Sequence, residues 1–399
     1  MTPFDLVVVG AGPAGSAAAL AALQARPGAR VLLLDRAEFP RDKSCGDGVA
    51  PHALDELARL GVPDLLADRV AVRRLRLRSP GGTEVAAPLR RPDVVVPRTV
   101  LDARLVDAAV AAGARFVQHQ VRRLEVRAGE VVLDGRLRAR TVVGADGAHG
   151  VVRRLLALPR QPERHAAVAV RGYARAPAGD PDQVIVMDSR GWPAYAWSFA
   201  AGDGTANVGF GMLLPQLRAA AAGDGRSGRE ALHGRLRELL PGVQPERLLA
   251  SHLPLSTWRP RQPAGRVLLA GDAASLVNPL TGEGIYYALA SGRLAGTAAV
   301  TADGPAAGDL DPGTTYARAL HRELGRHLRH TTALARLTAR PGVVDAGVAS
   351  AGRSSAVFDA LVELGLGRGL VTTPLVGGLV GEVARRAVRG RAPAGSRSR

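Results

Sequence analysis

The sequence of 399 residues is poor in cysteine, lysine and aromatic side chains. A single cysteine excludes an internal disulfide framework and fits a reducing compartment. Aromatic residues make up 4% of the chain, and no segment alternates basic with aromatic side chains as nucleic-acid-binding surfaces do. We therefore expect no nucleic-acid partner, and the sequence predicts no metal site.

A membrane-spanning segment is also missing from the sequence. Residues 6–25 carry no charge, but Gly10, Gly12 and Gly15 interrupt this run in a way that suits a tight turn better than a spanning helix. The one charge before the run, Asp5, is acidic, whereas a signal peptide begins with basic residues. These features predict a cytoplasmic protein.

The charge that is present has one dominant sign. The formal net charge is +17, and it comes almost entirely from arginine because the chain has one lysine. One interpretation is a GC-rich coding sequence, which enriches arginine, alanine and glycine. The other is attraction of the protein to an anionic membrane surface, where it would associate peripherally.

The order of apolar segments predicts an α/β fold. Residues 4–9 and 31–34 are expected to be buried strands, and the helix of residues 14–25 joins them into a βαβ unit. Residues 73–88 are expected to form a hairpin. Alternating segments after residue 165 predict an antiparallel sheet, and the last seventy residues have helical spacing.

The fold class is therefore α/β, with a Rossmann-like nucleotide-binding domain interleaved with an antiparallel-sheet substrate domain and followed by a helical C-terminal region. The predicted nucleotide-binding domain comprises residues 1–164 and 256–305 and includes the connecting strands. The predicted substrate-binding sheet domain comprises residues 165–255. The predicted helical region comprises residues 306–390, and residues 391–399 are predicted to be a disordered tail.

The first candidate site is the glycine-rich turn after the first strand. Gly10 permits the tight turn, Gly12 lets a pyrophosphate approach the backbone, and Gly15 lets helix and strand pack closely. Asp35 ends the second strand, where an acid can accept ribose hydroxyls. The predicted dinucleotide contacts in this unit also include Ala14 and Arg36.

Two later motifs also follow buried strands. Asp146 and Gly147 belong to the sequence GADG, and Gly271 and Asp272 begin the sequence GDAA. A carboxylate at a strand end can accept a ribitol-type hydroxyl, while glycines at a helix start free backbone amides for a pyrophosphate or a negatively charged ring. After GDAA, Gly282 and Gly284 are expected to serve in this way, and Pro279 and Ile285 beside them are also predicted to contact the dinucleotide.

Together the three motifs resemble the fingerprints of the flavoprotein superfamily that includes para-hydroxybenzoate hydroxylase. The resemblance covers about residues 1–300 and implies bound FAD, two interleaved domains and a substrate sheet over the flavin ring. It also implies that Arg98 contacts the flavin nucleotide and that the backbone at Val121 touches adenine. The alternatives are a surface arginine and an ordinary strand valine.

The loop of residues 39–48, FPRDKSCGDG, resembles that of the geranylgeranyl reductase family. Lys43 is the only lysine and Cys45 the only cysteine, so both are candidate catalytic residues together with Asp47. Cys45 and Gly46 are also expected to lie against the flavin, where the thiol could donate weakly, tune the ring or act as an acid. A merely packed cysteine is the alternative.

A later strand carries aromatic residues similar to the substrate motif of this family. Alternation places Tyr195, Trp197 and Phe199 on one face, with Gly209 on the partner strand, so this face could line an apolar tunnel. A core stripe is the alternative. Ala200 stands where the family usually has proline, which puts the tunnel shape in doubt.

The family resemblance implies a reductase that saturates carbon–carbon double bonds of a prenyl chain, carried by a geranylgeranyl lipid or a polyprenyl quinone. NAD(P)H or another reductant, such as an electron donor protein, would reduce the flavin. An aromatic monooxygenase or related tailoring enzyme is the alternative, because one fold supports many reactions. A noncatalytic flavin-binding protein is the third possible function.

Overall fold

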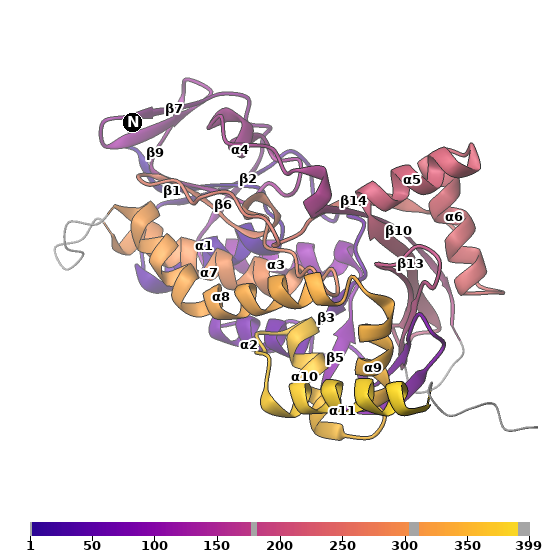
Figure 1. Ribbon diagram of the computed structural model, residues 1–399. Helices are drawn as coiled ribbons and strands as arrows, with labels where there is room; N and C mark the ends of the chain where they lie inside the picture. Colours follow the sequence, from indigo (N-terminus) through magenta and orange to yellow (C-terminus); the bar gives the residue numbers. More distant parts are fainter. Residues whose placement is uncertain (1, 177–181, 303–310, 390–399) are drawn as a thin grey trace, which may run out of the picture.

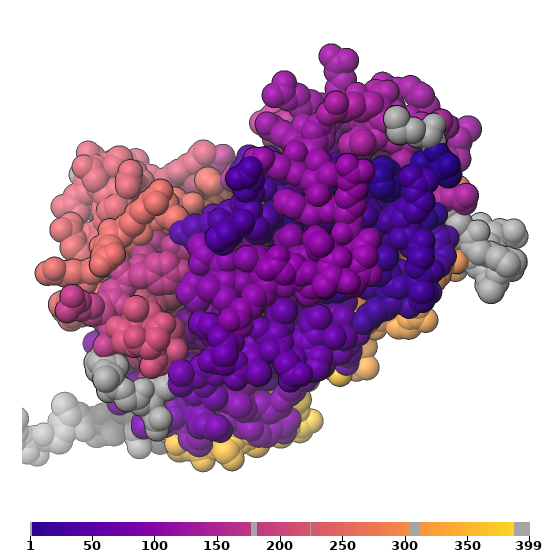
Figure 2. Space-filling view, turned by 180° about the vertical axis from the view of Figure 1, so that it is seen from behind, coloured from indigo at the N-terminus to yellow at the C-terminus, as the bar shows by residue number. Residues whose placement is uncertain are grey.

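Two β-sheets organise the molecule, and helices cover them on several sides (Figure 1). The computed structural model describes residues 2–176, 182–302 and 311–389. Seen from behind, the N-terminal segments cover most of the surface, and the C-terminal helices reach only its edge (Figure 2).

The first sheet has the order β6-β2-β1-β9-β8-β7, and β15 pairs with β9. Strands β6, β2, β1, β9 and β15 run parallel, while β7 and β8 form an antiparallel extension. Because helices or other elements cover both faces, β1 and β2 are almost entirely apolar. The strands are β1 (Phe4–Val9), β2 (Val31–Asp35), β6 (Arg115–Gln118), β7 (Leu124–Arg127), β8 (Glu130–Leu133), β9 (Leu137–Gly144) and β15 (Val267–Leu269).

Small residues allow two helices to pack closely against this sheet. A Cβ atom added at Gly292 would lie 2.1 Å from the Ala14 carbonyl oxygen, and one at Gly296 would lie 2.0 Å from that of Ala18. This close approach explains why the first helix is so rich in alanine. The helices concerned are α1 (Pro13–Ala25) and α7 (Ile285–Thr301), with α3 (Arg98–Ala111) packing beside α1.

The second sheet has the order β14-β10-β13-β12-β11-β4-β5-β3 and is antiparallel except where β11 pairs with β4. It draws on more of the chain than residues 165–255, because the predicted hairpin of residues 73–88 belongs to it as β4 and β5. The strands are β3 (Gly48–Val49), β4 (Ala71–Arg78), β5 (Glu84–Val95), β10 (Ala166–Arg175), β11 (Asp182–Met187), β12 (Ala194–Ala200), β13 (Thr205–Leu213) and β14 (Leu249–Pro254).

Helices α5 (Leu214–Asp224) and α6 (Gly228–Leu239) pack on β10 and β13 of this sheet. Shorter elements complete the connections between the sheets. They are α2 (Pro51–Arg59), α4 (Val151–Leu155) and the 3-10 turns η1 (Glu163–His165) and η2 (Gly271–Ala274).

The described part of the C-terminal region is helical, as predicted. Helix α8 (Pro312–Leu337) runs beside α7, and α9 (Pro341–Ala351), α10 (Ser355–Leu366) and α11 (Thr373–Arg389) gather below β5 (Figure 1). The predicted tail of residues 391–399 lies outside the described residues. The predicted α/β fold class is confirmed, with mixed rather than purely antiparallel pairing in the second sheet.

Candidate active site

The three glycine-containing motifs meet at one edge of the first sheet. Strands β1, β9 and β15 are parallel neighbours, so their carboxyl ends bring Gly10, Gly144 and Gly271 together. A Cβ atom at Gly10 would lie 2.4 Å from the carbonyl oxygen of Ala145, so the first two motifs pack backbone against backbone. Ala14 touches the third motif, because a Cβ atom at Gly271 would lie 3.0 Å from its methyl group.

The first turn forms an open cradle at the start of α1. Gly15 has no room for a side chain, since a Cβ atom there would lie 1.8 Å from the Gly10 carbonyl oxygen. At Gly12 a Cβ atom would meet the ends of the Arg41 and Arg98 side chains at 3.4 and 3.8 Å, and a carboxylate oxygen of Asp102 at 3.9 Å. No side chain caps α1, so its first amides and these guanidinium groups suit a pyrophosphate. This part of the structure therefore fits FAD.

Asp35 shapes the turn and also faces cationic groups. Its carboxylate accepts hydrogen bonds from the backbone amides of Ala11 (2.8 Å) and Ala37 (3.0 Å). Arg41 lies 3.7 Å from Asp35 and 3.2 Å from Asp102. Arg36, by contrast, is exposed.

The other nucleotide candidates occupy varied positions. Arg98 is 4% exposed and forms two 2.7 Å hydrogen bonds to Asp102, which fix its guanidinium group at the start of α3. Val121 is buried. Asp146 accepts a hydrogen bond from the Val152 amide at 2.9 Å and so holds the start of α4. Gly147 lies near Lys43, whose Nζ would be 3.9 Å from an added Cβ atom.

The loop of residues 42–48 bridges the two sheets. Arg171 on β10 pairs with Asp42 and donates to the Lys43 carbonyl oxygen at 3.1 Å. The Lys43 ammonium group lies 3.2 Å from Asp272 of the third motif. The lysine therefore joins the loop to two fingerprint motifs.

Asp47 anchors the end of this loop. It has a φ of +60° and is fully buried, with its carboxylate accepting hydrogen bonds from Tyr173 (2.5 Å) and Asn207 (2.8 Å). Asn207 also donates to the Cys45 carbonyl oxygen at 2.9 Å and accepts from the Trp197 indole at 2.8 Å. Burial raises the pKa of Asp47 to about 6, although these hydrogen bonds and the nearby arginines act in the opposite direction.

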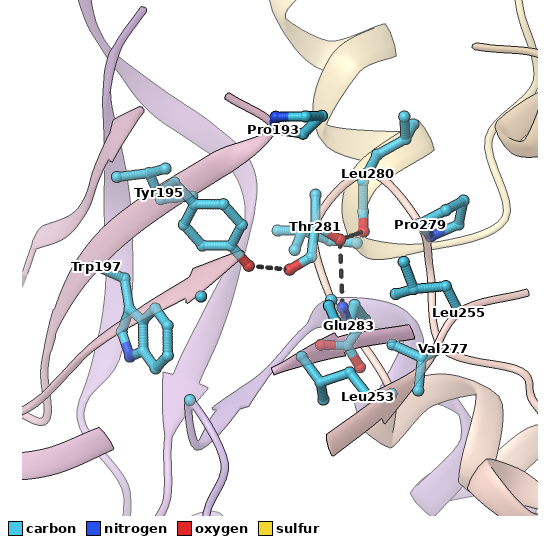
Figure 3. Close-up of a pocket in the computed structure, with 18 of the residues that line it drawn as sticks. Pro193, Tyr195, Trp197, Leu253, Leu255, Val277, Pro279, Leu280, Thr281 and Glu283 are labelled. Carbon is cyan, nitrogen blue, oxygen red and sulfur yellow. Dashed lines mark hydrogen bonds between the residues drawn. The ribbon is translucent and has the colours of Figure 1, made fainter. Parts of the chain in front are cut away.

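A cavity of about 550 Å³ opens beside this loop and runs along the second sheet. Tyr195, Trp197 and Phe199 line it from β12, with ring centroids 6.0 and 6.4 Å apart along the row. Gly209 lies behind Trp197, because a Cβ atom there would come within 2.2 Å of the indole. The Tyr195 hydroxyl donates to the Thr281 carbonyl oxygen across the cavity (Figure 3).

The cavity wall unites the predicted catalytic, substrate and flavin-ring residues. The predicted residues that line it are Lys43, Cys45, Gly46, Asp47, Arg98, Tyr195, Trp197, Phe199, Asp272, Pro279, Gly282, Gly284 and Ile285. The remaining predicted residues lie outside its lining, and all but Gly209 are predicted to bind the nucleotide. They are Gly10, Gly12, Ala14, Gly15, Asp35, Arg36, Val121, Asp146, Gly147, Gly209 and Gly271.

The C-terminal helices close the far part of the cavity with apolar side chains, among them Leu334, Val348, Leu364, Leu375 and Leu379. The sequence did not assign these helices to the site.

Buried hydrogen bonds tie the helices to the third motif. The Asn278 amide donates to the carbonyl oxygens of Leu364 (2.9 Å) and Gly365 (3.2 Å), and Thr281 donates to Gly365 at 2.5 Å.

Several titratable groups face the cavity, and burial shifts their pKa values. Burial raises the pKa of Cys45 above its ordinary value of 9.0, so the group remains a thiol near neutral pH. Burial also raises the pKa of Asp93 and of Glu283 to about 7 each. Both carboxyl groups therefore exchange protons near neutrality.

The prediction missed Arg41, Asp93, Asn207 and Glu283. Arg41 lies within the loop FPRDKSCGDG, and Glu283 lies between the predicted residues Gly282 and Gly284, but an arginine or glutamate there is ordinary until its burial and neighbours are known. Asp93 lies on the strand β5 and is 1% exposed. The sequence carried no signal for its burial, because the strand also contains exposed charged residues.

The arrangement suits a redox reaction on an apolar substrate. A pyrophosphate cradle leads to a cavity whose wall is mostly aliphatic and aromatic, although charged side chains such as Lys43, Arg98 and Glu283 also line it. Such a cavity can hold a hydrocarbon chain and exclude water from it. The described residues contain no group of three or more metal-ligating side chains placed to bind an ion.

Comparisons with known proteins agree with this geometry. The profile of the FAD binding domain family matches residues 4–178. The chain is 37% identical over 321 residues to the menaquinone reductase of Mycolicibacterium smegmatis, covering 74% of this chain and 76% of that protein. It is 36% identical over 316 residues to digeranylgeranylglycerophospholipid reductase 1 of Methanopyrus kandleri, covering 75% and 81%.

A solved structure shares the fold. It is the geranylgeranyl bacteriochlorophyll reductase-like protein of Thermoplasma acidophilum, with a TM-score of 0.75, 21% identity and 96% coverage of both chains.

Proposed function

Because the chain belongs to the geranylgeranyl reductase family of FAD-dependent oxidoreductases, we propose that it saturates carbon–carbon double bonds of a prenyl chain. The family is the one that the sequence predicted. The observation that carries the proposal is the aliphatic and aromatic cavity that begins at the loop of residues 42–48. A geranylgeranyl lipid or a polyprenyl quinone would be the substrate.

FAD, when reduced, supplies a hydride, and NAD(P)H or another reductant would restore it. The chain binds the dinucleotide through residues of the three motifs. In this proposal, Gly10, Gly12, Ala14 and Gly15 hold the pyrophosphate, with Asp35 and Arg36 beside the ribose and Val121 beside adenine. Arg98, Asp146, Gly147, Gly271 and Asp272 would hold the rest of the nucleotide and the ribityl chain. Gly46, Pro279, Gly282, Gly284 and Ile285 would contact the ring.

The loop of residues 42–48 would set the position of substrate and ring. Cys45 lies in the cavity wall, where its neutral thiol would contact the ring or the substrate and tune the reaction. Lys43 would hold Asp272 through their 3.2 Å contact, and Asp47 would fix the loop to the sheet. These three residues are the proposed catalytic set.

The aromatic row on β12 would orient the prenyl chain. Tyr195, Trp197 and Phe199 present a continuous apolar surface, and the C-terminal helices complete the tunnel. Excluding water protects the reactive site from side reactions. The C-terminal helices would then also face the membrane from which the substrate comes.

The test of this function is anaerobic saturation of a prenyl substrate. Purified holoenzyme reduced with dithionite would be mixed with menaquinone or a geranylgeranyl lipid, and the products analysed by mass spectrometry. We expect a gain of two hydrogens for each reduced bond. A strict requirement for oxygen would instead support the monooxygenase alternative. Flavin that no substrate reoxidises would support a noncatalytic flavin-binding protein.

A further inference from the structure

Saturation of an alkene needs a proton as well as a hydride, and four carboxyl groups line the cavity. Asp272 is paired with Lys43, which leaves Asp47, Asp93 and Glu283 as candidates. They differ in access to it. Asp47 is 0% and Asp93 is 1% exposed, and the Oδ1 atom of each is sealed from solvent without a hydrogen-bond partner among the described residues. Glu283 is only half-buried and lines the cavity, so its carboxyl group is the one that an enclosed substrate can reach.

Glu283 is also held in one place. It precedes α7, and one carboxyl oxygen accepts a hydrogen bond from the Tyr286 amide at 2.8 Å. Its own amide donates to the Thr281 hydroxyl at 3.3 Å. Figure 3 shows the side chain on the opposite side of the cavity from Tyr195 and Trp197. A substrate chain that lies along the aromatic row would therefore pass this carboxyl group.

Two other proton donors in the cavity wall, Cys45 and Tyr195, are weaker acids than Glu283. Burial raises the pKa of the Cys45 thiol above 9.0, and the pKa of the Tyr195 hydroxyl rises above its ordinary value for the same reason. Tyr195 also already donates its proton to Thr281. Glu283, with a pKa of about 7, combines a bound proton with the ability to release it near neutrality, as a general acid requires.

We propose that Glu283 is the acid that completes saturation of each double bond, which rests on the proposed reductase function. The π bond breaks, one carbon receives the hydride, and the adjacent carbon takes the proton of the Glu283 carboxyl group. The alkene gains two electrons, and the oxidation of reduced flavin balances them. Glu283 is left as a carboxylate and regains a proton from solvent.

Glu283→Gln tests this assignment, because glutamine keeps the size of the side chain and loses the acid. We expect the variant to bind FAD normally, while substrate reoxidises its reduced flavin at least about 100-fold more slowly. Glu283→Asp should recover part of the rate. Glu84 is exposed at the start of β5, so Glu84→Gln serves as the control and should reoxidise its flavin at the wild-type rate.

The pH profile separates an acid from a merely structural residue. The wild-type rate should fall as the pH rises through about 7, where Glu283 loses its proton, and this fall should be absent from the residual rate of Glu283→Gln. The titratable groups that face Glu283 are Cys45, Asp93 and Tyr195 from neighbouring elements, and Tyr287 of α7. Asp93→Asn is therefore measured in parallel and should keep the fall.

The visible absorption of bound, oxidised FAD, measured between about pH 5 and pH 9, provides a readout that is independent of turnover. A change with a midpoint near 7 that Glu283→Gln abolishes and Asp93→Asn retains would support the assignment. A Glu283→Gln variant with wild-type turnover and an unchanged titration would overturn it while leaving the reductase function intact. A wild-type enzyme that leaves prenyl bonds unsaturated would overturn both.

Discussion

At the scale of single residues, the site depends on polar side chains that each bind several partners. Asn207 is an example, because its amide holds both the Cys45 carbonyl oxygen and the Asp47 carboxylate while its oxygen accepts from Trp197. One side chain therefore sets the position of the loop and of the aromatic wall together. The position of Cys45 follows from this network and from the 3.4 Å hydrogen bond that its sulfur accepts from the Asp47 amide.

Cys45→Ser should retain FAD and change turnover. The serine hydroxyl is smaller and more polar than the thiol, so it alters the contact with ring or substrate without disturbing Asn207, which binds the backbone of this residue. Flavin content from the absorption spectrum and steady-state rates with a prenyl substrate would measure the two effects. Unchanged turnover would show that Cys45 is merely structural.

Asp93 should make the folded protein less stable as the pH rises. Burial raises its pKa from 3.8 to about 7, so between these values the folded state binds one proton that the unfolded chain has lost. The free energy of unfolding therefore falls as the pH rises through this window. Because one pKa unit corresponds to about 1.4 kcal/mol, Asp93→Asn should reduce this fall by at least roughly 1 kcal/mol.

Urea unfolding of wild type and variant at pH values near 5 and 8 measures this difference. Glu84→Gln, on the exposed end of the same strand, provides the comparison. Parallel pH dependences for wild type and Asp93→Asn would show that Asp93 is ionised in the folded protein.

At the scale of elements, the C-terminal helices and the third motif act as one unit. The Tyr287 hydroxyl of α7 lies 2.7 Å from His327 of α8 and donates to the Gly367 carbonyl oxygen at 2.9 Å, just after α10. Asn278 joins the same cluster through its 2.9 Å contact with Tyr287. The C-terminal helices that close the cavity, called the lid below, are thus bound to the loop that carries Pro279 to Gly284.

Tyr287→Phe should loosen this lid. The substitution removes the hydroxyl that pairs with the His327 Nε2 atom and with the Gly367 carbonyl oxygen, and the loss of these buried hydrogen bonds costs roughly 1–3 kcal/mol of folding free energy. Limited proteolysis should cut the chain faster near Gly367, while the FAD cradle around Gly12 stays intact. Tyr173→Phe, which removes a hydroxyl on β10 far from the lid, tests whether the effect is local. Equal proteolysis of wild type and Tyr287→Phe would contradict the role given to this cluster.

At the scale of the whole molecule, one helix faces both the cavity and the solvent. Leu375 and Leu379 of α11 line the cavity, while Val376, Val380 and Val383 of the same helix are 47%, 64% and 53% exposed. No helix among the described residues is long and apolar enough to cross a membrane. We propose that this exposed face, with the net charge of +17, holds the enzyme against an anionic membrane surface.

Val380→Asp should weaken binding to vesicles that contain phosphatidylglycerol, because it removes apolar contact and adds a repelled charge. We expect a severalfold loss in a flotation assay, with less binding of the wild type to pure phosphatidylcholine vesicles and at high salt. Val126→Asp is the matched control, since Val126 is 58% exposed on β7, away from the lid. Similar losses for both variants would contradict a docking role for α11.

The sequence by itself determined the nucleotide-binding turn, the three motifs and the aromatic row. These features depend on local patterns. The tight turn at Gly10 and the shared face of Tyr195, Trp197 and Phe199 follow from neighbouring residues in the sequence. Only the tertiary structure decided that β4 and β5 join the second sheet, that the C-terminal helices close the cavity, and that Glu283 faces it. Each of these features depends on contacts between segments that are distant in the sequence. The burial that sets the protonation of Glu283 arises only when these segments pack together.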